Sequence, residues 1–127
     1  MILLSLDTAS VAGQPAGREQ RIGDAALRVE RAMARLQEAE ATARLAAAFG
    51  VSPRAVTELR DQKLALGEVA VVLALAETGK TSPDTILSLW ASGRLTWGEI
   101  ADRLKVEQRS LLRRLDAARR DLTHQSR

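Results

Sequence analysis

Cysteine is absent from the 127-residue sequence, and histidine occurs only once, as His124. Without cysteine the chain has no disulfide, no thiolate ligand for zinc and no cysteine nucleophile. A single histidine near the C-terminus lacks the orienting partner that a general base needs, and no motif of paired carboxylates stands out. We therefore expect a protein that is not an enzyme and that binds neither a metal nor a cofactor.

Aromatic residues and long apolar runs are also scarce. The chain has two tryptophans, one phenylalanine and no tyrosine, whereas single-stranded nucleic acid usually stacks on several aromatic side chains. The longest uncharged apolar run, Val69 to Ala76, has eight residues, and a helix needs ~20 to span a bilayer. The sequence thus disfavours a single-stranded partner and predicts no transmembrane helix.

The N-terminal segment MILLSLDTASVAG begins with apolar residues and contains Ser10-Val11-Ala12, which resembles a signal-peptidase site. No basic residue precedes its apolar stretch, which is short and is interrupted by Asp7. As it stands, this segment is a poor secretion signal, and we expect a cytoplasmic protein. A coding start upstream of Met1 would instead favour a periplasmic or secreted one.

Helix-forming residues dominate the composition. Alanine (22) and leucine (19) supply a third of the chain, while valine and isoleucine together total only 12. Alanine and leucine rank high in helix propensity, and 46% hydrophobic with 28% charged residues is typical of a globular domain. The sequence therefore predicts an all-α protein: a long N-terminal helix, duplicated helix-turn-helix units that supply four shorter helices, and a basic C-terminal helix.

Three segments can be distinguished along the chain. Residues 1–17 contain Gly13, Pro15 and Gly17 and are expected to form a flexible lead-in. Residues 18–49 read as one long amphipathic helix, and Gly50 follows where a glycine favours a helix end. Residues 50–127 form a helical domain of two ~31-residue repeats followed by the basic C-terminal helix.

Apolar residues recur at heptad spacing in the predicted long helix. Every seventh position is apolar, and an alanine lies three positions after each: Ile22, Val29, Leu36 and Ala43, with Ala25, Ala32, Ala39 and Ala46. Such a seam fits packing against the chain's own domain, and it equally fits a coiled coil in a homodimer formed through residues 22–46. Both interpretations remain open at this point.

Two matching strings indicate an internal duplication. Residues 63–70 (KLALGEVA) and 94–101 (RLTWGEIA) share the pattern basic-Leu-x-x-Gly-Glu-(Val/Ile)-Ala, and each is preceded by a Ser-Pro pair that favours a helix start. The first Ser-Pro pair, at residues 52–53, predicts a helix that runs to about Gln62. The second pair, at residues 82–83, predicts a helix that runs to Gly93. In the second string, Thr96 and Glu99 have the spacing of a capping box.

Positive charge is concentrated in the last third of the chain. Residues 1–93 carry ten basic and eleven acidic groups, whereas residues 94–127 carry nine basic and five acidic groups. Sixteen of the 19 basic residues are arginines, and the planar donor fork of arginine suits phosphates and guanine edges. A solvated, salt-bridged helix face is the alternative interpretation of this cluster.

The string ILSLWASGRLTWGEIADRLKVEQRSLLRRL, residues 86–115, resembles the helix-turn-helix unit of resolvases, transposases and sigma-factor C-terminal regions. The resemblance implies double-stranded DNA as the partner, a dimeric regulator as the function, and a second helix that lies in the major groove. It places Gln108, Arg109 and Arg113 toward base edges, and Ser110 and Arg114 nearer phosphates. Arg94, Lys105, Arg119 and Arg120 are then expected to hold the DNA backbone.

The sequence departs from that unit at two positions. Lys105 stands where glycine is usual and must adopt a left-handed conformation at some energetic cost, and Glu107 stands where a serine usually caps the recognition helix. The tandem LxxGE(I/V)A pattern, over about residues 49–106, also resembles small uncharacterised bacterial helical proteins, many of which carry export signals. That second resemblance implies a non-enzymatic protein-interaction or structural module as the alternative function.

Overall fold

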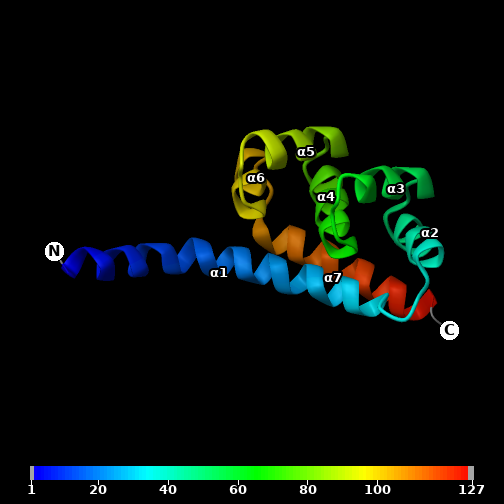
Figure 1. Cartoon of the computed structure of the whole chain (residues 1–127), viewed down its shortest axis with the longest axis horizontal. Helices are drawn as coiled ribbons and strands as arrows, with labels where there is room; N and C mark the ends of the chain where they lie inside the picture. The colour runs from blue at the N-terminus through cyan, green and yellow to red at the C-terminus, as the bar shows by residue number, and fades with distance from the viewer. Residues whose placement is uncertain (1, 126–127) are drawn as a thin grey trace.

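The computed structural model describes the backbone of residues 2–125 and the side chains of residues 17–124. This part of the chain is all-α, as predicted, and contains no strand. Seven helices follow one another (Figure 1): α1 (Ile2–Ala32), α2 (Glu38–Phe49), α3 (Pro53–Asp61), α4 (Leu66–Thr78), α5 (Pro83–Ser92), α6 (Trp97–Arg103) and α7 (Gln108–Gln125). None of the described helices combines the length and the apolar character needed to cross a membrane.

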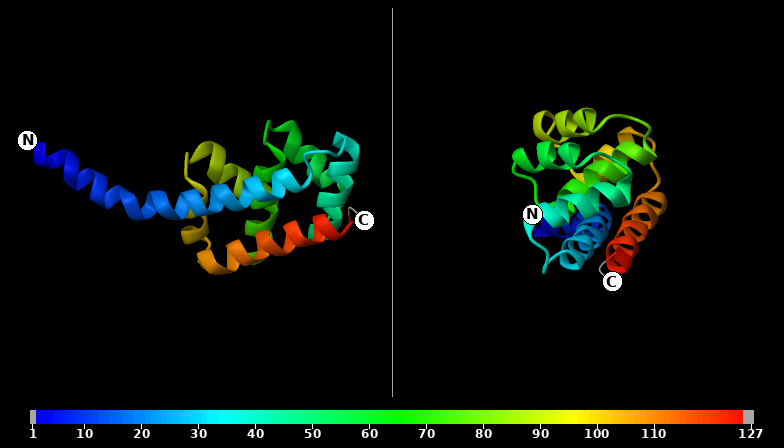
Figure 2. Two further views of the ribbon diagram at one scale, coloured as in Figure 1. Left: turned by 90° about the horizontal axis from the view of Figure 1, so that it is seen from below. Right: turned by 90° about the vertical axis from the view of Figure 1, so that its right-hand side faces the viewer.

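The first and last helices lie side by side and run in the same direction, with α2 to α6 on one side of this pair (Figure 2). Helix α4 packs against both of them, and its residues from Val69 to Ala76 are all buried. A helix that is apolar all round is stable only where it is covered on all sides. The eight-residue apolar run in the sequence is thus the central element of the core.

The prediction of a single helix over residues 18–49 is wrong. α1 ends at Ala32, and α2 begins at Glu38 after a turn in which Met33 N–H donates to Glu30 O at 3.0 Å. No proline or glycine marks this turn in the sequence. Its cause is tertiary: Met33 is buried, and Arg60 of α3 holds the first residue of α2, Glu38, through Nε–Oε2 and Nη2–Oε1 bonds of 2.8 and 2.9 Å.

The turn decides between the two interpretations of the heptad seam. Ile22, Ala25 and Val29 of α1 and Ala46 of α2 are buried in the chain's own core, whereas Ala43 is exposed. A homodimer formed through residues 22–46 would have to open this core, so the structure favours packing within the chain's own domain. The seam instead packs α1 and α2 onto the rest of the domain.

The backbone shows no boundary at residue 17. α1 is helical from Ile2 and continues through Gly13, Pro15 and Gly17, whereas the sequence predicts a flexible lead-in over residues 1–17 and a helix that begins near residue 18. Glycine lowers helix propensity but still makes its helical hydrogen bonds, and proline removes one donor. The composition of this stretch was therefore a poor guide to where the helix begins.

Helices α3, α5 and α6 begin where the sequence predicts. Ser52 Oγ accepts a hydrogen bond from Ala55 N–H at 3.2 Å, and Ser82 Oγ accepts one from Thr85 N–H at 3.2 Å. In each case the proline occupies the first turn, where its missing N–H costs no helical bond. The predicted capping box is also present, because Thr96 Oγ1 accepts from Glu99 N–H while Glu99 Oε1 accepts from Thr96 N–H.

Both matching strings begin a helix that touches α1. A Cβ atom on Gly67 would lie 2.4 Å from Ala26 O, and one on Gly98 would lie 2.8 Å from the Arg18 side chain. Glu19 of α1 also accepts hydrogen bonds from Trp97 N–H (3.2 Å) and Gly98 N–H (2.9 Å). The glycine of each string thus permits a close helix approach, and α1 contacts the N-terminal ends of both α4 and α6.

We predict that Gly67→Ala lowers the free energy of unfolding by about 1–3 kcal/mol, because the added methyl group would collide with the α1 backbone. Gly23→Ala is the control: it lies within α1, and a Cβ there meets no atom within 4 Å. The control is expected to raise stability by about 0.5–1 kcal/mol. Urea unfolding measures both, and equal effects of the two substitutions would contradict the close packing.

The capping box makes stability depend on pH. Hydrogen bonds from the backbone N–H and the hydroxyl of Thr96 lower the pKa of Glu99 from its ordinary value of 4.5. Because the pKa of Glu99 is lower in the folded state, its ionised carboxylate stabilises the fold above pH 4.5. This contribution is lost as the pH falls through the folded-state pKa of Glu99. Glu99→Ala should lower Tm at pH 7, with a difference from wild type that narrows below pH 4.5. A constant difference down to pH 3 would contradict this role.

Candidate nucleic-acid interface

Helix α7 has one buried side and one side that faces solvent. Its buried residues pack against α1, α2 and α4: Leu111, Leu115, Ala118 and Leu122. With 3.6 residues per turn, Arg109, Arg113 and Arg120 fall together on the opposite side, and all three are exposed. We call these three residues the outer arginines.

Two of the outer arginines have no ionic partner in the described part of the chain. The side chains of Arg109 and Arg113 are exposed and form no ion pair with a described residue. Arg120 Nε lies 3.4 Å from Asp116 Oδ2, with 59% of the arginine side chain exposed. Exposed pairs of this kind contribute little to stability, so all three guanidinium groups are accessible to an anion.

Arg114 has a structural role that the sequence did not reveal. Its Nε donates to Glu77 Oε2 at 2.6 Å and its Nη2 donates to Ala48 O at 2.9 Å. The guanidinium also lies 4.4 Å from the centroid of the Phe49 ring, within the range of a cation–π contact. Arg114 therefore joins α7 to α4 and α2, and it is not placed to contact a phosphate as the resemblance implied.

Two residues at the start of α7 also differ from the expected base-reading arrangement. Gln108 is half-buried, and its Nε2 atom is enclosed without a hydrogen-bond partner among the described residues. Ser110 is half-buried too. Of the three residues predicted to face base edges, the structure therefore presents Arg109 and Arg113 to solvent and turns Gln108 inward.

The backbone at Lys105 is left-handed, as the sequence requires, with φ of 59°. Arg94 is also left-handed, with φ of 51°, and both side chains are exposed. Lys105 lies in the turn between α6 and α7, three residues before the first residue of α7. Arg94 lies at the other end of α6, so the structure does not bring it together with the outer arginines.

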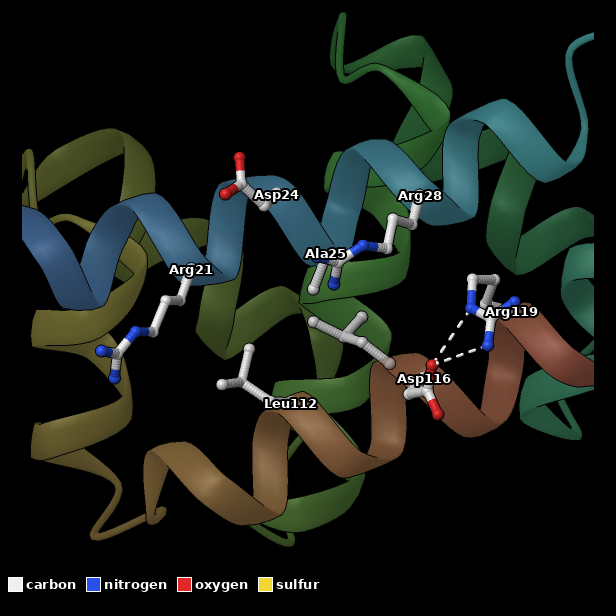
Figure 3. Close-up of a pocket in the computed structure, with 8 residues that line it drawn as sticks. Arg21, Asp24, Ala25, Arg28, Leu112, Asp116 and Arg119 are labelled. Carbon is white, nitrogen blue, oxygen red and sulfur yellow. Dashed lines mark hydrogen bonds and ion pairs between the residues drawn. The ribbon is translucent and has the colours of Figure 1, made fainter.

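Helix α1 supplies basic residues that the sequence analysis missed. A groove between α1 and α7, with a cavity volume of about 260 Å³, is lined by two arginines of α1, Arg21 and Arg28, and by Arg119 of α7 (Figure 3). Arg21 and Arg28 are exposed. Each directly precedes a residue of the heptad seam, Ile22 or Val29. This repeated position is the feature of the sequence that could have indicated basic residues beside the buried side of α1.

Acidic residues near the groove neutralise only part of this charge. Asp116 Oδ1 accepts hydrogen bonds from Arg119 Nε at 3.0 Å and Nη2 at 2.9 Å. Asp24 of α1 also lines the groove, with its carboxylate turned away from α7 in Figure 3. Arg21 and Arg28 form no ion pair with any residue whose side chain is described.

Arg113 and Arg114 are neighbours with different surroundings, and this gives a matched test. Arg114→Ala should lower the free energy of unfolding by about 1–2 kcal/mol, because it removes hydrogen bonds that join three helices. Arg113→Ala removes an exposed side chain without a described partner and should change stability by less than about 0.5 kcal/mol. Thermal unfolding of both variants measures the two changes in stability. A larger loss of stability in Arg113→Ala would contradict the structural role of Arg114 and the free surface position of Arg113.

Comparison with protein-family models, with curated proteins and with solved structures found no match. The interpretation of this surface thus depends on its own geometry. Exposed arginines of α7 and of α1 belong to two adjacent helices, whose outer side the other helices leave uncovered (Figure 2). Such a surface is suited to bind an extended anion.

Proposed function

We propose that the protein binds double-stranded DNA, mainly through its phosphates. The proposed contact surface, which we call the arginine face, consists of Arg21, Arg28, Arg109, Arg113 and Arg120. One observation carries the proposal: all five side chains are exposed on the α1/α7 layer, and four of them have no carboxylate partner among the described residues. Phosphate contacts of arginine and lysine supply most of the affinity of non-specific DNA binding.

The aromatic residues favour a duplex over a single strand. Trp90 and Trp97 stack on each other, with ring centroids 3.9 Å apart and planes inclined by 2°. Trp97 is buried and Trp90 is half-buried, so neither offers a free face to an unpaired base. Proteins that bind single strands without sequence preference usually stack bases on aromatic side chains.

The apolar surface favours nucleic acid over a membrane. Peripheral helices hold to a bilayer by inserting large apolar side chains between the headgroups. Among the described side chains, Leu27 is the one large hydrophobic residue that is exposed, at 45%. A surface with several arginines and so little exposed apolar area is suited to phosphates that remain in water.

The packing of α7 favours phosphate contacts over the reading of bases. The major groove is about 12 Å wide and accommodates one helix, whose diameter with side chains is about 10–12 Å. Helix α1 runs beside α7 over most of its length, and the pair is too wide to enter together. We therefore expect weak sequence preference, which revises the base-reading role implied for Gln108, Arg109 and Arg113.

Binding of a random 20-base-pair duplex, followed by fluorescence anisotropy, tests the proposal. Three to five phosphate contacts should weaken binding roughly 40- to 500-fold between 50 and 200 mM salt. The double variant Arg109→Ala/Arg113→Ala should weaken binding at 50 mM salt roughly tenfold to a hundredfold and reduce the slope of log affinity against log salt by about 2.

The matched control is Arg54→Ala/Lys63→Ala, which lowers the formal net charge by the same two units. Arg54 lies on α3 and Lys63 follows it, and both side chains are exposed. If the control variant weakens duplex binding as much as the test variant does, general attraction to a basic protein explains the affinity. The proposal that the arginine face is the contact surface is then wrong. A wild-type protein that binds no duplex at 50 mM salt would overturn the function itself.

A further inference from the structure

The groove between α1 and α7 has an apolar base and charged sides, on which three arginines outnumber two aspartates, Asp24 and Asp116. Ala25 and Leu115 are buried at its base, and Leu112 is half-buried beside them. Arg28 of α1 and Arg119 of α7 lie on opposite sides (Figure 3). Toward the C-terminal end of α1, a second hollow shares Arg28, Asp116 and Arg119 with this groove and adds Arg31.

The two arginines differ in their partners. Arg28 is exposed, forms no ion pair with a described side chain, and folds back toward Ala25 at the mouth of the groove in Figure 3. Arg119 directs two N–H groups at a single oxygen of Asp116, at 2.9 and 3.0 Å. The pair therefore does not use both oxygens of the carboxylate, as the parallel bidentate pairs of arginine with carboxylates and phosphates do.

Asp116 holds two basic side chains of α7. Its second oxygen, Oδ2, lies 3.4 Å from Arg120 Nε, and the aspartate side chain is 47% exposed. An aspartate three residues before one arginine and four before the next pairs with both on the helix surface. The Arg120–Asp116 pair is exposed, and the Arg119–Asp116 pair is partly exposed, with 34% of the arginine side chain open to solvent. Water and salt reach both pairs and screen them, so an external anion can compete for the two arginines.

We infer that the groove between α1 and α7 is a binding site for a phosphate group, with Arg28 and Arg119 as its ligands and Asp116 as an internal competitor. A phosphate carries more negative charge than a carboxylate and has oxygens for both arginines, so it can bridge α1 and α7 where Asp116 reaches only α7. The inference deepens the proposed function where the phosphate belongs to a DNA backbone. A small phosphorylated molecule would use the same groups.

Asp116→Asn tests the inference against Asp121→Asn. Both substitutions remove one negative charge from α7, but Asp121 is exposed and forms no ion pair with a described side chain. Asp116→Asn releases Arg119 and Arg120 and should tighten binding of the 20-base-pair duplex about threefold to tenfold at 50 mM salt. Asp121→Asn should have a clearly smaller effect.

Pyrophosphate, titrated into the same variants, distinguishes the two sources of phosphate. The inference is supported for small phosphates if Asp116→Asn tightens binding of both probes, and for a polymer backbone alone if only duplex binding tightens. Equal effects of the two aspartate substitutions on both probes would overturn it, even if wild type binds duplex. If no duplex binds, the proposed function fails. The effects of the two aspartate substitutions on pyrophosphate binding then test the phosphate site on their own.

NMR of the wild-type protein locates the ligand independently of any variant. Addition of the probe that binds should shift the side-chain Nε–Hε signals of Arg28 and Arg119, and Arg28→Ala should weaken binding. The signal of Arg54, which pairs with Glu58 on α3, is the internal reference and should remain in place. Shifts at other arginines without shifts at Arg28 and Arg119 would place the anion elsewhere and contradict the site.

Discussion

The fold depends on the contact of α1 with the N-terminal ends of two other helices. Gly67 and Gly98 allow α4 and α6 to approach α1 closely, and Glu19 accepts hydrogen bonds from two free amides at the start of α6. A carboxylate at a helix N-terminus satisfies unpaired donors and interacts favourably with the helix dipole. Because α1 is fixed in this way on one side, its other side is free to pack along α7 and to form the groove.

The local signals in the sequence predicted much of the fold and little of the site. Ser52, Ser82 and Thr96 begin helices by hydrogen bonds within three residues, so their sequence neighbours suffice to predict them. The turn at residues 33–37 has no local signal, because it depends on burial of Met33 and on the pairing of Glu38 with Arg60, 22 residues away. The same holds for Arg114: its partners Glu77 and Ala48 lie on other helices, and sequence spacing cannot separate it from Arg113.

The arginines of this chain divide into cross-links and a free surface. Arg60 and Arg114 each join separate helices through hydrogen bonds to a carboxylate and a backbone carbonyl, whereas Arg28, Arg109 and Arg113 face solvent. A charge cluster in a sequence contains both kinds, and only the helix packing separates them. The proposal of DNA binding therefore relies on fewer residues of α7 than the resemblance implied, and it adds residues of α1.

The parallel pairing of α1 and α7 has a consequence for how the chain acquires its structure. The side of α1 that packs against α7 stays exposed during synthesis until α7 is made, because the five other helices separate the two along the sequence. Contacts between distant parts of a chain form late, since a long loop must close first. Loss of α7 would leave an apolar strip uncovered on α1, so a product truncated before Gln108 is expected to aggregate.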